Sequence, residues 1–147
     1  MRIRDFLIDD HRHCDDLFAV AEQSASTGDL RGAEAAFEQF SAAVLRHFTT
    51  EEQTLFPAFE SRTGMRMGPT QVMRMEHDQM RTLVDEAAQA LRANQADDFL
   101  GQLETLLIMM QQHNMKEENI LYPMCDQHLA DMGEGLLAQM KVELARA

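Results

Sequence analysis

The sequence predicts an all-α protein, an up-down-up-down four-helix bundle with an additional C-terminal helix. Apolar residues recur at three- and four-residue steps over long segments, which is the period of an amphipathic helix. Pro and Gly gather in a few short stretches between these segments. Because short connections between long helices make neighbours antiparallel, we expect a single domain over residues 1–147.

The expected helices cover about residues 5–27, 30–61, 69–94, 97–129 and 133–146, so that the bundle spans about 5–129. Asp29 and Asp97 are placed to cap the second and fourth helices, because a carboxylate there accepts from free backbone N–H groups. Pro69 suits the first turn of the third helix.

Charge and composition exclude several classes of partner. The formal net charge is −12, which argues against nucleic acid and anionic membrane surfaces because both require a basic face. No apolar run approaches the roughly 18 residues of a membrane span, and the first residues lack the apolar core of a signal peptide. Two cysteines are too few for a disulfide scaffold. We therefore expect a cytoplasmic protein.

Four histidines form a regular lattice along the chain. The interval from His11 to His47 equals the interval from His77 to His113, so the second half of the chain repeats the first. Residues separated by the interval from His11 to His77 hold equivalent positions in the two halves. At a rise of about 1.5 Å per residue, both members of a pair lie equally far from the connection between their helices. One layer of the bundle should therefore hold four imidazoles, one from each long helix.

The second histidine of each pair opens the same phrase, H-x-x-x-E-E-x-x-L-[FY]-P. Glu51 and Glu117 each follow their histidine by four residues and so share its helix face. Glu52 and Glu118 turn about 140° away and should face outward or toward a neighbouring helix. Burying four imidazoles and two carboxylates is costly unless they hold divalent ions. The sequence predicts a two-metal site made of His11, His47, Glu51, His77, His113 and Glu117.

The chain resembles hemerythrin-like proteins of the HHE cation-binding kind over about residues 5–128. The motifs are Asp10-His11-Arg12, His47-x-x-x-Glu51-Glu52 with Leu55-Phe56-Pro57, Glu76-His77, and His113-x-x-x-Glu117-Glu118 with Leu121-Tyr122-Pro123. Oxygen-carrying hemerythrins have five histidines and an HxxxH on the third helix, where this chain has Met73 in place of the first histidine. The chain is more similar to the four-His, two-Glu arrangement of the iron-centre repair family.

The resemblance implies two iron ions (Fe²⁺/Fe³⁺) joined by a bridging oxo or hydroxo group. It implies that His11 and His113 hold one iron and that His47 and His77 hold the other. Glu51 and Glu117 would then bridge both ions. Zinc or manganese in the same ligand set is the alternative.

Several residues around this layer are candidates for tuning the site. Cys14 and Met80 each lie three residues past a ligand histidine, where they could line the cavity or simply fill the core. Met73 lies one turn before His77. Asp15 and Arg81, which also hold equivalent positions in the two halves, could pair or orient ligands, or make ordinary surface contacts.

Other residues flank the ligands directly in sequence. Asp10 and Glu76 precede a histidine and could accept an imidazole N–H from a neighbouring helix. We expect Phe56 and Tyr122 to pack near kinks made by the prolines that follow them. Tyr122, like Cys14, Met73 and Met80, is expected to lie next to the metal ligands, with a redox role as the lesser alternative.

Three functions remain open at this point. The first is a non-haem di-iron protein that binds O₂, NO or peroxide for sensing, storage, detoxification or iron handling. The second is an enzyme that reduces NO or peroxide or delivers iron to damaged clusters. The third is a non-redox module for divalent cations. The expected partners are a small diatomic or peroxidic ligand and an unidentified electron donor. The sequence leaves the oligomeric state open, with a homodimer through the last helix as one alternative.

Overall fold

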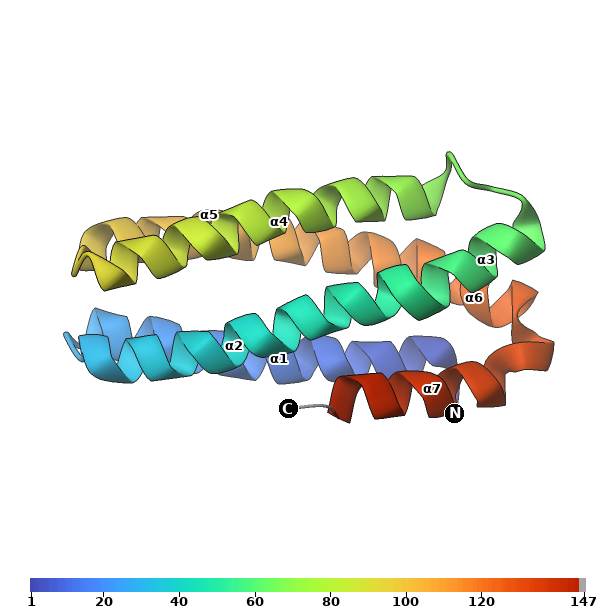
Figure 1. Ribbon diagram of the computed structural model, residues 1–147, viewed down its shortest axis with the longest axis horizontal. Helices are drawn as coiled ribbons and strands as arrows, with labels where there is room; N and C mark the ends of the chain where they lie inside the picture. Colours follow the sequence, from blue (N-terminus) through green and yellow to red (C-terminus); the bar gives the residue numbers. More distant parts are fainter. Residues whose placement is uncertain (146–147) are drawn as a thin grey trace.

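The computed structural model describes residues 1–145 and is helical throughout, with no strand in that range. The long helices are α1 (Ile3–Ser26), α2 (Leu30–Thr50), α4 (Pro69–Arg92) and α5 (Ala96–Lys116). The second segment continues through η1 (Glu51–Leu55) and α3 (Phe56–Thr63), and the fourth through η2 (Glu117–Leu121) and α6 (Tyr122–His128). A short turn η3 (Ala130–Met132) leads into α7 (Gly133–Ala145), which lies along the outside of α1 and α2 (Figure 1). The predicted four-helix bundle with a C-terminal helix is confirmed.

The chain reverses between helices at residues that suit the turns. Gly28 adopts φ +86° after α1, a conformation that favours glycine. Asp29 accepts a hydrogen bond from the N–H of Gly32 at 2.9 Å, which confirms it as the cap of α2. The expected cap at Asp97 is wrong, because the helix begins earlier, after Gln95, and Asp97 lies in its first turn without capping it.

Each repeated phrase passes from α-helix into one turn of π-helix. The N–H of Phe56 donates to the carbonyl of Glu51, and the N–H of Tyr122 donates to that of Glu117, in both cases five residues back. The next residue is a proline, which lacks the N–H that an α-helical hydrogen bond needs. The bend expected at the prolines is thus a widened turn that begins at the glutamates.

Two hydrophobic clusters fill the bundle on either side of a polar layer. On α1, Leu7 belongs to one cluster and Cys14 to the other, with His11 between them. The larger cluster includes Phe18, Phe40, Phe99 and Leu103, and the smaller one includes Ile3, Leu55, Phe59 and Leu121. Burial of both clusters stabilises the bundle and fixes the height of the layer between them.

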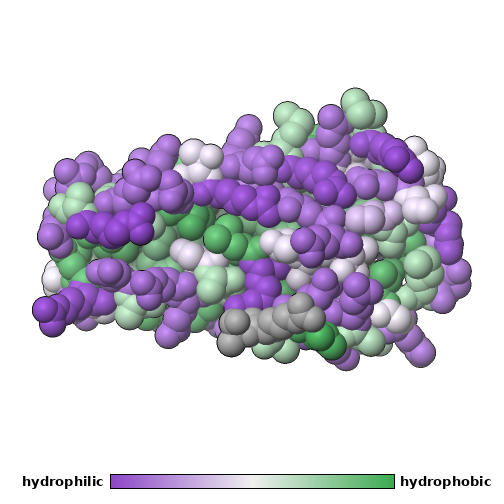
Figure 2. All heavy atoms as spheres, viewed as in Figure 1, coloured by the Kyte–Doolittle hydropathy of each residue, from purple (hydrophilic) through white to green (hydrophobic). Residues whose placement is uncertain are grey.

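Most of the molecular face seen in Figure 2 is hydrophilic. Hydrophobic side chains appear on it as smaller patches between the hydrophilic ones. Among residues 1–145, no helix combines the length and the apolar character that crossing a bilayer requires.

Candidate metal centre

The six predicted ligands meet in the polar layer. Each long helix contributes one histidine, and each π turn begins with one of the glutamates. Their exposed fractions are 4% for His11, 2% for His47, 0% for Glu51, 0% for His77, 1% for His113 and 0% for Glu117. The spacing argument therefore placed all six side chains at one height.

Each carboxylate lies between two imidazoles of different halves of the chain. Glu51 Oε1 is 3.4 Å from Nε2 of His47 and 3.1 Å from Nε2 of His77. The second glutamate makes the matching contacts, at 3.1 and 3.3 Å, to Nε2 of the two remaining histidines. These contacts group the histidines in the way that the resemblance implied.

Ring-to-ring distances give a second grouping. The ring centroids of His11 and His47 are 4.6 Å apart, and those of His77 and His113 are 4.9 Å apart. Donor atoms within 4.8 Å of one another form a set of four, Glu51, His77, His113 and Glu117, and a set of three, His11, His47 and Glu117. Which histidines share a metal ion stays a prediction.

A second carboxylate holds the outer nitrogen of every imidazole. The Nδ1 atoms of His11, His47, His77 and His113 lie 2.7, 2.7, 2.8 and 2.8 Å from carboxylate oxygens of Glu118, Asp10, Glu52 and Glu76. The expectation that Asp10 and Glu76 accept from a neighbouring helix is confirmed. Glu52 and Glu118 also face neighbouring helices, where they hold a histidine of the other half of the chain.

These outer contacts determine which nitrogen faces the centre unprotonated. An ionised carboxylate only accepts, so in the neutral imidazole Nδ1 carries the proton and Nε2 keeps the lone pair that a metal ion or a second proton can take. The lone pairs therefore point at carboxylate oxygens, which are also acceptors. Buried atoms without a hydrogen-bond partner include Nε2 of His77 and His113, Oε1 of Glu51 and Oε2 of Glu117. Such a set of buried acceptors fits divalent cations, and its nitrogen and oxygen donors suit iron, zinc or manganese.

Protons and metal ions compete for the same lone pairs. Burial lowers the pKa of His113, but the charge of Glu117 and its hydrogen bond outweigh burial and raise the pKa to about 9. In the outer set, burial raises the pKa of Glu52, but hydrogen bonds from His77 and Arg81 lower it to about 2. Glu52 is therefore an ionised acceptor near neutral pH, as the orientation of His77 requires.

The hydroxyl of Tyr122 lies among the predicted metal ligands, closer to them than packing beside a kink requires. Its hydroxyl is 2.6 Å from Glu51 Oε2 and 2.9 Å from Glu117 Oε1, and it is fully buried. Burial raises its pKa well above 10, and both carboxylates raise it further. The hydroxyl is thus a protonated donor among the predicted ligands. The sequence placed Tyr122 beside the site but did not predict its hydrogen bonds to both central glutamates.

Aromatic rings hold the imidazoles of the layer. His77 lies between Phe48 and Phe56, with ring centroids 4.2 and 5.7 Å away and interplanar angles of 19° in both cases. His11 stacks on Tyr122 at 5.7 Å. These flat contacts restrict rotation of the rings, so the ligand nitrogens are oriented before any ion arrives.

The remaining candidates border the layer. Cys14 and Met80 are buried in the larger hydrophobic cluster, and Met73 is buried in the smaller one. Burial raises the pKa of Cys14 to about 12, so it stays a thiol near neutral pH. Cys14 and Cys125 are both buried free thiols.

The comparisons with known proteins agree with this centre. A family model described as the hemerythrin HHE cation-binding domain matches residues 2–125. Neither the curated proteins nor the solved structures gave a match. The family match covers most of the chain and includes all six predicted ligands of the polar layer. The chain belongs to the hemerythrin HHE cation-binding domain family.

Proposed function

We propose that this protein is a non-haem di-iron protein that binds O₂, NO or peroxide in its bundle core. The observation that carries the proposal is the set of four Nε2 atoms that face two buried glutamates, with the Nδ1 atom of each histidine held by a second carboxylate. Four imidazoles and two carboxylates leave coordination positions free on a pair of iron ions. Iron ions with free coordination positions bind small oxygen and nitrogen ligands reversibly and exchange electrons with them.

The chain contributes positioning, basicity and exclusion of water. The outer carboxylates fix the tautomer of each imidazole and raise the basicity of its inner nitrogen. Glu51 and Glu117 neutralise positive charge in a buried space, where such interactions are strong. The hydrophobic clusters on both sides of the polar layer keep large molecules out, so that only small ligands reach it.

A reductive activity on NO or peroxide is the second candidate, and Tyr122 is the observation that favours it. Reduction of either molecule builds negative charge on its oxygen atoms, and the Tyr122 hydroxyl is a hydrogen-bond donor within the centre, 2.6 Å from Glu51. Phe56 holds the equivalent position in the first repeated phrase, so this donor is present on one side of the site.

Anaerobic titration tests the proposal. Protein loaded with Fe²⁺ is mixed with NO, O₂ or hydrogen peroxide while optical and electron paramagnetic resonance spectra are recorded. The proposal predicts a saturable spectral change with at least one of them, reversed by removal of the ligand for a binder and followed by turnover with added reductant for an enzyme. Unchanged spectra, together with zinc in the isolated protein, would support the non-redox cation module instead.

A further inference from the structure

The two halves of the centre differ in charge at several equivalent positions, among them Arg12 and Asp78, and Asp15 and Arg81. Arg81, on the second half, donates to Glu52 at 3.0 and 2.7 Å through its two terminal nitrogens. Its guanidinium also lies over the ring of Phe48, with 5.6 Å to the centroid. This contact closes the outside of the His77–Glu52 pair. The equivalent position in the first half, four residues after His11 as Arg81 is four after His77, holds Asp15.

The equivalent pair in the first half is His11–Glu118, and Asp15 cannot donate hydrogen bonds to it as Arg81 does to Glu52. Within residues 1–145, Glu118 makes no ion pair with a lysine or arginine side chain, although it holds Nδ1 of His11. The side chain of Glu118 is 28% exposed, against 19% for Glu52. The outer carboxylate of His11 is therefore in contact with solvent and lacks the two-bond clamp of its counterpart. Arg4 donates instead to the backbone carbonyl of Glu118, at 2.7 Å, and the charges of Arg4 and Arg12 act on the carboxylate without an ion pair.

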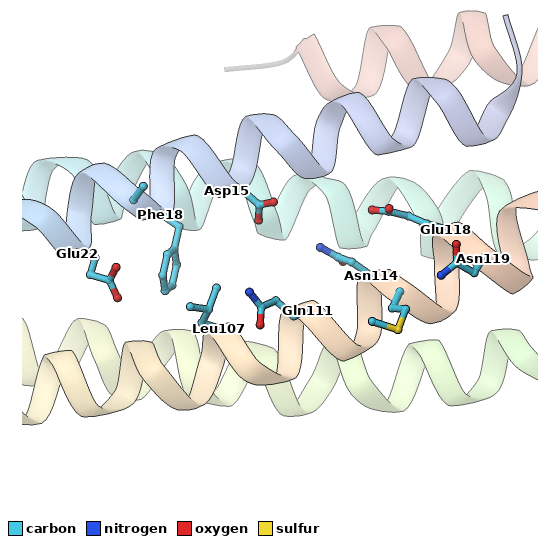
Figure 3. A pocket seen from close by; sticks show the side chains of 10 residues that line it. Asp15, Phe18, Glu22, Leu107, Gln111, Asn114, Glu118 and Asn119 are labelled. Carbon is cyan, nitrogen blue, oxygen red and sulfur yellow. The ribbon is translucent and has the colours of Figure 1, made fainter.

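A groove of about 680 Å³ lies on this open side, between α1 and the α5–η2 segment. Figure 3 shows the polar ends of Asp15, Gln111, Asn114 and Glu118 directed into the space between these helices. Phe18 and Leu107 border one end, and no lysine or arginine lines the groove. The groove thus brings solvent to the carboxylate that touches a metal ligand, and its lining is acidic or neutral.

We propose that the centre takes up and releases its metal ions from the α1/α5 side, past Glu118 and His11. This proposal rests on the proposed function, because it needs a metal in the polar layer. A divalent ion that arrives here meets oxygen donors and no positively charged side chain in the lining of the groove. On the opposite side, Arg81 repels a cation and must break two hydrogen bonds before the His77–Glu52 pair can open.

The route is tested by exchange rates at constant metal content. Wild-type protein is loaded with Fe²⁺ anaerobically, and release to excess ferrozine is followed by absorbance. Asp15→Arg places at the first half the cation that the second half already has. We expect it to slow release roughly fivefold, the factor that a favourable partly exposed salt bridge supplies. Asp16→Arg is the matched control, since it makes the same charge change at the next, exposed position and should leave the rate unchanged.

A second variant keeps the test independent of how Asp15→Arg folds. Gln111→Arg places a cation in the same groove from the opposite wall, at an exposed position, and should also slow release. Equal rates for wild type, Asp15→Arg and Gln111→Arg would overturn the proposed route. So would faster release from Arg81→Gln combined with unchanged release from Asp15→Arg, because that result places the route on the other side. Failure of wild-type protein to hold iron would instead contradict the proposed function.

Discussion

Tyr122 and Glu51 are joined by a 2.6 Å hydrogen bond across the bundle, although they are 71 residues apart in sequence. The hydroxyl also lies 2.9 Å from Glu117, so one buried proton donor serves both central carboxylates. This relationship links the C-terminal π turn of one half to the glutamate of the other. The centre is otherwise close to twofold symmetric, but it has the Tyr122 hydroxyl on one side and the ring of Phe56 at the equivalent position on the other.

Replacing Tyr122 with Phe should keep the metal ions and weaken the fold. Glu51 Oε2 would lose its donor, and a hydrogen bond to a charged group contributes about 1.5–3 kcal/mol to the free energy of unfolding. Denaturant titration of the metal-free variant measures this loss. Phe56→Leu is the control for packing alone. A Tyr122→Phe protein as stable as wild type would show that the hydroxyl bond is unimportant.

The central and outer glutamates should differ in their effect on metal content. Glu51→Ala or Glu117→Ala removes a donor atom, whereas Glu52→Ala or Glu118→Ala removes only the acceptor behind an imidazole. We expect the outer variants to bind metal about 10–100-fold more weakly yet to fill at excess metal, which is the usual effect of losing such a partner. Elemental analysis after dialysis measures both sets. Equal losses in all four variants would contradict the assignment of ligands.

The height of the histidines was predictable from sequence, whereas the hydrogen bonds of Tyr122 to the central glutamates were not. Counting residues from His11 and from His47 to their shared connection is a matter of helical rise, which varies little. Tyr122 follows Glu117 by five positions, and in an α-helix this step turns about 140°, away from the site. In a π turn, residues five apart are stacked by the hydrogen bond between them, so Tyr122 lies over Glu117.

The π turns could be predicted only weakly from the sequence. Pro57 and Pro123 mark a break in hydrogen bonding, but a proline alone predicts a kink as readily as a widened turn. Glu52 and Glu118 were correctly placed off the ligand face. Their bonds to His77 and His11 depend on how neighbouring helices pack, which periodicity does not fix.

Metal-free protein should lose stability as the pH rises. His113 has a pKa of about 9 in the folded chain and about 6.5 when unfolded, so proton binding favours the folded state. This contribution is complete below about pH 6.5 and disappears as the pH approaches 9. The pKa values of His11, His47 and His77 are also raised against the opposing effect of burial, by nearby glutamates among other groups, and act in the same direction.

Thermal unfolding of metal-free protein between pH 6.5 and 9 measures this loss. The metal-loaded form is the control, because an ion in place of the proton removes the dependence on these histidines. A midpoint that stays constant or rises with pH in the metal-free protein would contradict the assigned protonation states.

Removing the metal should lower the unfolding midpoint at fixed pH. A ligand that binds only the folded state at about 100 times its dissociation constant adds roughly 2.7 kcal/mol. Thermal unfolding with and without a chelator measures this difference, and restoring Fe²⁺ should reverse it. Identical midpoints in all three samples would argue against an ion in the layer.

The metal-to-protein ratio of protein isolated without added metal tests the central claim most directly. Elemental analysis should find about two metal ions per chain, mainly iron, as expected for a bundle-core site of this donor set. Mössbauer spectra of the same sample should show the iron as coupled pairs. A ratio near zero, in wild-type protein purified from iron-replete cells, would contradict the claim.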